Sequence, residues 1–190
     1  MSVENMKKIP EQIIKLISTG KVLDLGCGRG WATDYIHKDN YIGTTDIEFH
    51  KHYLQGFNII IHRITSDNKL PFENNQFDNI IASHIIEHLD KQEVNNAMKE
   101  IKRVLKPKGT LILITPTGYS TGFNGNWTHW RPYNHGSLTG ILRGYDYKNI
   151  KWGYPKIFNY PKFIQRYGRF LKIFNEFIFN EVIAYGENQK

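Results

Sequence analysis

Several features are scarce in this chain of 190 residues. It has one cysteine, Cys27, which excludes an intramolecular disulfide. No apolar run reaches the roughly 18 residues of a transmembrane helix and no signal-peptide pattern is present, so we expect a cytoplasmic protein. Repeats and low-complexity tracts are absent, and the length predicts one domain over residues 1–190. Acidic residues number 18 against 25 Lys and Arg, and the net charge of +7 favours an acidic partner without deciding it.

The chain is organised around the stretch from Lys21 to Ile36, which reads KVLDLGCGRGWATDYI. The apolar run Val22–Leu25 predicts a buried parallel strand, and Trp31–Lys38 predicts a helix. The glycine-rich segment Gly26–Gly30 lies between them. Glycine has no Cβ and tolerates positive φ, so a backbone built this way can pass close to a ligand. The helix that follows would offer unpaired N–H groups at its start.

The spacing of the glycines and of two acids indicates which ligand. The third glycine comes one residue too early for the dinucleotide fingerprint G-x-G-x-x-G. Asp24, two residues before Gly26, would repel a pyrophosphate but would suit a cationic amine. Asp46 follows a second predicted strand, Tyr41–Thr45, at the place where a ribose diol is usually bound. A ligand with a ribose, an amine and no phosphate fits both acids, and S-adenosylmethionine is such a ligand.

Four motifs follow one another along the chain: DLGCGRG, GTTD, LPFENNQFDNIIASHIIEHL and KEIKRVLKPKGTLILITP. Through them the segment Val22–Pro116 resembles the class I S-adenosylmethionine-dependent methyltransferases, especially their broad small-molecule branch. The resemblance implies an α/β, Rossmann-like sheet of seven mostly parallel strands. Their implied order is 3-2-1-4-5-7-6, with the last strand antiparallel and helices on both faces. It also implies S-adenosylmethionine as the cofactor and methyl transfer as the reaction.

The resemblance also implies a cofactor site at the ends of the strands. In this family an acid just before the LPF segment often contacts the adenine amino group, and that position falls here on Ser66 or Asp67. We interpret Cys27 as a small packing residue whose backbone matters. The implied cofactor-binding residues are Asp24, Gly26, Cys27, Gly28, Asp46, Ile47, Ser66, Asp67 and Ser83.

Two histidines follow the predicted fourth strand, Phe77–Ala82. His84 would lie nearest the transferred methyl group, and His88 comes one helical turn later. A neutral imidazole can accept a proton from a hydroxyl, so we predict a catalytic role for His84 and a substrate-binding role for His88. The alternative is that His84 contributes only its backbone and that His88 caps or packs. The segment Ala82–Ile85 lacks the [DN]-P-P-[YF] pattern common in enzymes that methylate exocyclic base amines.

A long segment at residues 117–135 gathers glycine, asparagine and aromatic side chains. A loop of this length in a compact domain is usually functional or disordered, and aromatic residues argue against disorder. We therefore expect an aromatic substrate loop over the cofactor. Its HWRPY segment resembles an H-x-R-P-[YF] pattern of the family. His129 is a second catalytic candidate, and Trp130 and Arg131 are substrate-binding candidates, with Arg131 as an anion clamp. A loop anchored by its own aromatic rings is the alternative.

Three further features have competing interpretations. Residues 1–18 predict an amphipathic helix that covers the sheet, and the alternative is a lid over the cofactor. Residues 147–190 carry 8 Lys and Arg against 3 Asp and Glu, with a predicted basic aromatic helix at Pro161–Phe174. Such a region could bind nucleic acid or an anionic membrane surface, or simply cover the sheet. His50 and His52 form an H-x-H pair without a third ligand nearby in the sequence, so no metal site is predicted.

Two classes of function follow from these patterns. The aromatic loop and the missing [DN]-P-P-[YF] pattern favour O- or N-methylation of a small-molecule acceptor. The basic C-terminal region favours the alternative, a nucleic-acid or protein methyltransferase, or a module that binds the cofactor without turnover. The sequence indicates neither the acceptor nor an oligomeric state.

Overall fold

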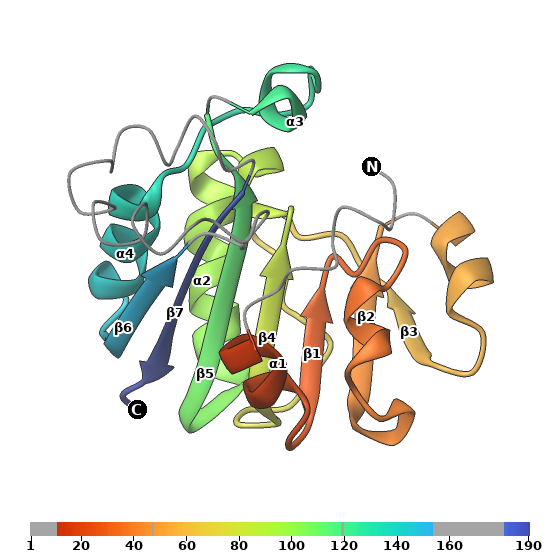
Figure 1. Cartoon of the computed structure of the whole chain (residues 1–190). Coiled ribbons are helices and arrows are strands. Elements are labelled where there is room, and N and C mark those ends of the chain that lie inside the picture. The colour runs from red at the N-terminus through yellow and green to blue at the C-terminus, as the bar shows by residue number, and fades with distance from the viewer. Residues whose placement is uncertain (1–10, 47, 119, 154–180) are drawn as a thin grey trace, which may run out of the picture.

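The computed structural model describes residues 11–46, 48–118, 120–153 and 181–190. A seven-stranded sheet with the order β3-β2-β1-β4-β5-β7-β6 runs through the middle of the molecule (Figure 1). Strand β7 pairs antiparallel with both of its neighbours, whereas the pairs among β1 to β5 are parallel. The predicted fold class, strand order and antiparallel last strand are confirmed. The strands are β1 (Val22–Leu25), β2 (Tyr41–Thr45), β3 (Asn58–Ile61), β4 (Phe77–Ser83), β5 (Leu105–Pro116), β6 (Tyr147–Gly153) and β7 (Glu181–Asn188).

Helices cover both faces of this sheet. The α-helices of the described residues are α1 (Glu11–Ile17), α2 (Lys91–Val104), α3 (Thr121–Asn124) and α4 (His135–Gly144). None of them is long and apolar enough to cross a membrane. The helix predicted over residues 1–18 is present as α1, and its first ten residues lie outside the described ranges, as does the helix predicted at Pro161–Phe174.

Alternating side chains along the strands build two hydrophobic cores. On β5, Leu111 and Leu113 belong to the core that includes buried residues of α2 and α4. Ile112 belongs to the opposite core, together with Ile13 and Ile17 of α1. Because successive side chains of a strand point to opposite faces, an unbroken apolar run is what a strand covered on both sides requires.

Two predicted elements differ from the structure. The helix predicted at Trp31–Lys38 is replaced by two short 3-10 turns, Trp31–Asp34 and Lys38–Asn40. The N–H and the hydroxyl of Thr33 both bond the carbonyl of Gly30, at 3.0 and 2.6 Å, and this i to i+3 pairing tightens the turn. The prediction of an α-helical N-terminus directly after the glycine loop is therefore wrong.

The second difference lies between α2 and β5. Pro107 and Gly109 favour a helix stop and a loop at residues 106–109, with the fifth strand beginning at Thr110. The structure differs, because β5 begins at Leu105, directly after the helix. Lys108 adopts a φ of 62°, and the pairing of β5 with β4 is irregular near its start. The Pro-Lys-Gly segment therefore lies within β5, where the pairing with β4 shifts register, and does not form a separate loop.

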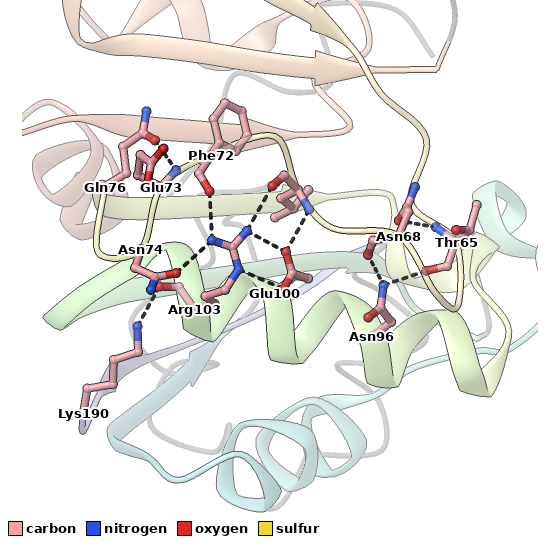
Figure 2. A network of polar contacts seen from close by, with 11 residues as sticks. Thr65, Asn68, Phe72, Glu73, Asn74, Gln76, Asn96, Glu100, Arg103 and Lys190 are labelled. Atoms are coloured by element: carbon pink, nitrogen blue, oxygen red, sulfur yellow. Dashed lines mark hydrogen bonds and ion pairs between the residues drawn. The ribbon is translucent and has the colours of Figure 1, made fainter.

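A polar network on α2 holds the segment that leads into β4 (Figure 2). Arg103 donates to both carboxylate oxygens of Glu100, at 2.9 and 2.7 Å, and to the carbonyls of Leu70 and Phe72 at 3.0 and 2.8 Å. Glu100 accepts the N–H of Leu70 at 2.8 Å. The hydrogen bond from Arg103 is the main cause that lowers the pKa of Glu100. The guanidinium of Arg103 thereby holds both the buried carboxylate of Glu100 and the backbone segment that precedes β4 in the sequence.

We predict that Arg103→Ala lowers the free energy of unfolding by about 2–4 kcal/mol, because Glu100 loses its charged partner and two carbonyls lose their donor at the same time. Arg103→Lys keeps the charge but loses the planar fork, and should recover only part of the loss. Urea unfolding followed by circular dichroism measures both variants. Equal stability of Arg103→Ala and the wild type would show that water replaces the network without cost.

Candidate active site

The carboxyl ends of β1, β2 and β4 meet at one edge of the sheet, the upper edge in Figure 1. Leu25, the last residue of β1, pairs with Thr44 of β2 and with Ala82 of β4. The glycine loop after Leu25 therefore lies between Asp46, which follows β2, and Ser83, which ends β4. Open α/β sheets bind their ligands at this kind of edge.

Three glycines of the loop have positive φ: 71° at Gly26, 52° at Gly28 and 76° at Gly30. A Cβ at Gly30 would lie 2.1 Å from Leu54, and one at Gly26 would lie 2.7 Å from Ile85. A Cβ at Gly28 would meet nothing within 4 Å. A Cβ at either outer position would require Ile85 or Leu54 to move and would strain a positive φ, whereas the space above Gly28 is open to a ligand.

Asp24 is fully buried beneath this loop. Its Oδ2 accepts a hydrogen bond from the Tyr41 hydroxyl at 2.9 Å, while Oδ1 is buried without a hydrogen-bond partner. Burial raises the pKa of Asp24 to about 7, and the bond from Tyr41 offsets part of that rise. The spare acceptor suits a donor such as an ammonium group. Because no part of Asp24 is exposed, an amine would reach it through a water molecule or after a shift of the loop.

Cys27 is a packing residue, in agreement with its interpretation from the sequence. Its N–H donates to the Thr44 carbonyl at 2.8 Å, which ties the loop to β2. The thiol is buried, and burial, followed by the charge of Asp24, raises its pKa to about 12. A Cβ on Gly43 would lie 2.9 Å from Sγ, so the thiol occupies space that only glycine leaves free.

The other predicted cofactor residues lie at the periphery. Asp46 is exposed, and Ile47 lies outside the described residues. Ser66 and Asp67 are both exposed. Asp67 accepts the hydroxyl of Thr65 at 2.8 Å, and its turn is held by Asn96 of α2, which donates to the Thr65 carbonyl at 2.8 Å. The structure does not choose between Ser66 and Asp67, so that pair stays a prediction.

His84 lies between two carboxylates at the end of β4, directly after the buried Ser83. Its Nε2 is 3.0 Å from Glu181 Oε1 at the start of β7, and its Nδ1 is 3.4 Å from Glu87 Oε1. Burial alone would lower the pKa of His84, but the hydrogen bond to Glu181 and the charges of both acids raise it to about 9. An imidazolium has no lone pair with which to take a proton. This geometry argues against the general-base role that we predicted for His84.

His88 and His129 meet above the end of β4, with ring centroids 4.5 Å apart. Thr128 donates its hydroxyl to Asn126 Oδ1 at 2.8 Å, so it accepts from His88 Nδ1 at 2.9 Å. His129 Nδ1 donates to the Phe123 carbonyl at 3.0 Å. Both rings therefore carry their proton on Nδ1 and a lone pair on Nε2. Burial is the main cause that lowers the pKa of His88, which keeps it neutral near pH 7.

The aromatic loop is attached to the turn after β4 by a backbone bond. The N–H of Trp130 donates to the Glu87 carbonyl at 2.8 Å, which sets His129 beside His88. Trp130 is 74% exposed, and Arg131 is exposed with its guanidinium over the Tyr133 ring at 5.9 Å. The aromatic loop and the turn after β4 thus lie in contact, while the substrate roles of His88, Trp130 and Arg131 stay predictions.

Sequence reasoning missed three groups at this edge: Tyr41, Glu87 and Glu181. Glu87 stands next to His88 in the sequence, but nothing in the pattern shows that it is fully buried. Tyr41 is the first residue of β2, and an aromatic residue at such a position is ordinarily part of the hydrophobic core. Glu181 lies 97 residues from His84, so no local signal connects the two.

Comparison with known proteins agrees with this architecture. Residues 23–113 match the family model of a methyltransferase domain. An S-adenosylmethionine-dependent methyltransferase from Archaeoglobus fulgidus has the same fold, with a TM-score of 0.74 and 20% identity over 98% of this chain and 94% of that one. Residues 23–113 therefore have the sequence pattern of a methyltransferase domain, and the chain has the fold of an S-adenosylmethionine-dependent methyltransferase.

Curated relatives of the domain differ in their named reactions. Phosphoethanolamine N-methyltransferase of Plasmodium falciparum is 30% identical over 135 residues, which are 66% of this chain and 48% of that protein. The mitochondrial arginine-hydroxylase NDUFAF5 of Mus musculus is 31% identical over 94 residues, 47% of this chain and 27% of that protein. The chain therefore spans about half or less of the length of these relatives.

The residues of the loop and its neighbours fit the cofactor of this family. The open space above Gly28 allows close approach of a ligand, and the exposed Asp46 can accept hydrogen bonds from ribose hydroxyls. Asp24 Oδ1 is a buried acceptor without a hydrogen-bond partner, and it suits the amine of the cofactor. When bound, S-adenosylmethionine supplies a methyl group activated by a sulfonium.

We predict that Asp24 makes the stability of the protein depend on pH. Its pKa is about 7 in the folded state against the ordinary 3.8, so the folded state keeps a proton that the unfolded state releases. Its contribution is therefore lost as pH rises from about 4 to about 7, by at most about 4 kcal/mol. Asp24→Asn should remove this part of the slope, measured as the difference from wild type in urea unfolding at each pH.

Tyr41→Phe provides a second, opposite variant. It removes the hydrogen bond that lowers the pKa of Asp24, so the loss of stability should extend to higher pH than in the wild type. Parallel stability curves for wild type and Asp24→Asn between pH 4 and 8 would contradict the assignment.

Proposed function

We propose that the protein transfers a methyl group from S-adenosylmethionine to an oxygen or nitrogen atom of a small molecule. The observation that supports this most directly is the loop at residues 117–135, joined to the end of β4 through Trp130 and Glu87. This loop carries exposed indole rings and a single Lys or Arg, Arg131. Such a surface suits a small acceptor more than the sugar-phosphate backbone of a nucleic acid, which favours several cations.

The reaction is an in-line displacement, in which a lone pair of the acceptor forms a bond to the methyl carbon as the sulfur–carbon bond breaks. S-adenosylhomocysteine leaves, and an acceptor hydroxyl or ammonium also loses a proton. Positioning of the acceptor and exclusion of water carry most of such catalysis. His84, paired with two acids, orients rather than accepts a proton. The Nδ1 atoms of His88 and His129 bond Thr128 and the Phe123 carbonyl, so Nε2 is the atom through which either ring would take a proton.

The relatives support a small acceptor without fixing it. One is named for N-methylation of phosphoethanolamine, a small amine. Another is named an arginine-hydroxylase, so similarity at this level does not fix the reaction. The basic C-terminal region favours a second candidate, methylation of a nucleic acid or protein, but residues 154–180 lie outside the described ranges.

The proposal is tested with methyl-labelled S-adenosylmethionine and a panel of acceptors. Small amines, hydroxyl compounds and carboxylic acids form one group, and RNA, DNA and basic peptides form the other. We expect label transfer and release of S-adenosylhomocysteine with members of the first group. Transfer confined to the second group would replace this proposal by the second candidate. Cofactor binding without turnover on either group would identify a binding module.

Asp46 provides a test of the cofactor site that needs no acceptor. We predict that Asp46→Ala weakens binding of S-adenosylhomocysteine by roughly 1.5–3 kcal/mol, the cost of losing charge-assisted hydrogen bonds to the ribose. Isothermal titration calorimetry measures the affinity, and NAD should give no signal. Asp39→Ala is the matched control, since this exposed acid precedes β2 at the opposite edge of the sheet. Wild-type affinity in Asp46→Ala would remove this residue from the site.

A further inference from the structure

Glu87 has two carboxylate oxygens without a hydrogen-bond donor. The residue is completely buried, and neither of its carboxylate oxygens accepts a hydrogen bond. His84 Nδ1 lies 3.4 Å from Oε1, close enough for an ion pair but without hydrogen-bond geometry. A buried carboxylate in this state is costly unless a cation compensates it.

The imidazole of His84 is shared between two acids. Its Nδ1 faces Glu87 and its Nε2 faces Glu181, so one ring serves both carboxylates. The Nδ1 atoms of His88 and His129 are already engaged with Thr128 and the Phe123 carbonyl, so neither Nδ1–H is directed at Glu87. The geometry thus leaves the buried carboxylate of Glu87 with unused acceptor positions.

Two imidazoles lie within reach of the same carboxylate. Glu87, His88 and His129 each offer a ligand atom, and these atoms all lie within 4.8 Å of one another. Both histidines are partly exposed, so the cluster has a route to solvent. The main contact to be displaced is the one at 3.2 Å between Asn126 Nδ2 and His129 Nε2.

Both rings make outer hydrogen bonds of the kind that metal-binding histidines make. Metal-binding histidines usually donate their other N–H to a carbonyl, carboxylate or similar acceptor, which fixes the tautomer. His129 donates Nδ1–H to the Phe123 carbonyl, and His88 donates Nδ1–H to the Thr128 hydroxyl. The bond from the Trp130 N–H to the Glu87 carbonyl fixes the backbone that joins the three ligands.

We infer that Glu87, His88 and His129 form a binding site for a divalent transition-metal ion. One carboxylate and two imidazoles are a ligand set that Zn²⁺, Co²⁺ and Fe²⁺ accept, with further coordination positions left for water or a substrate oxygen. This inference departs from the sequence analysis, which predicted no metal site. It is independent of methyl transfer, since the ligands come from this chain whatever the acceptor is.

The experiment uses tag-free, full-length protein freed of metal by a chelator and titrated with Co²⁺. We expect one equivalent to bind, with a visible d–d absorption band that Zn²⁺ removes. Glu87→Gln and His129→Gln should each weaken Co²⁺ binding more than about 100-fold, and Thr128→Val, which removes the acceptor for His88, at least about 10-fold. His129→Gln lies on the loop, so it still tests the site where the buried Glu87→Gln fails to fold.

His37→Gln is the matched control, because this exposed histidine lies beside Asp39, at the amino-terminal end of β2. It should leave the band and the affinity unchanged. No band in the wild type, or equal Co²⁺ affinity in the wild type and in His129→Gln, would overturn the inference and leave Glu87 as a counter-ion of His84 alone. Binding is read without an acceptor, so failure here leaves the proposed methyl transfer standing, and the reverse also holds.

Discussion

The candidate site depends on the parallel pairing of β1 with β2 on one side and β4 on the other. This pairing brings three strand ends to one edge and places the glycine loop between them. It also buries β1 on both faces, which leaves Asp24 as a carboxylate in a dry core. The same constraint that positions the ligand loop therefore produces the unusual acid beneath it, because helices must cover both faces of a parallel sheet.

The pairing of His84 with two acids at the end of β4 is a second consequence. The chain leaves β4 through His84, which has a φ of 54°, an uncommon conformation for a residue other than glycine. This turn brings the imidazole between Glu87 and Glu181 and buries Glu87 completely. Strained backbone persists only where its surroundings stabilise it, and two acids supply that stabilisation by holding the ring as a cation.

The sequence predicts the sheet better than it predicts the site. The apolar runs and the glycine loop were enough to place the first strands, because these signals are local. The strand order came from the resemblance to a known family, which the order of the four motifs carries. The helix after the loop was wrong because Thr33 binds back to Gly30, a choice that helical spacing does not reveal. The state of His84 was not predictable, since it depends on Glu181, 97 residues away in the chain.

Side chains at the strand ends, rather than the fold, distinguish this protein from others with the same sheet. A likeness at 20% identity shows a common architecture, which by itself leaves the reaction open. What is particular here is a loop joined to the β4 turn by a backbone bond, with Trp127 94% exposed and Trp130 74% exposed. Two indoles in water beside a cluster of imidazoles form a surface that gains free energy when an acceptor covers it. The loop is therefore where specificity for the acceptor should be sought.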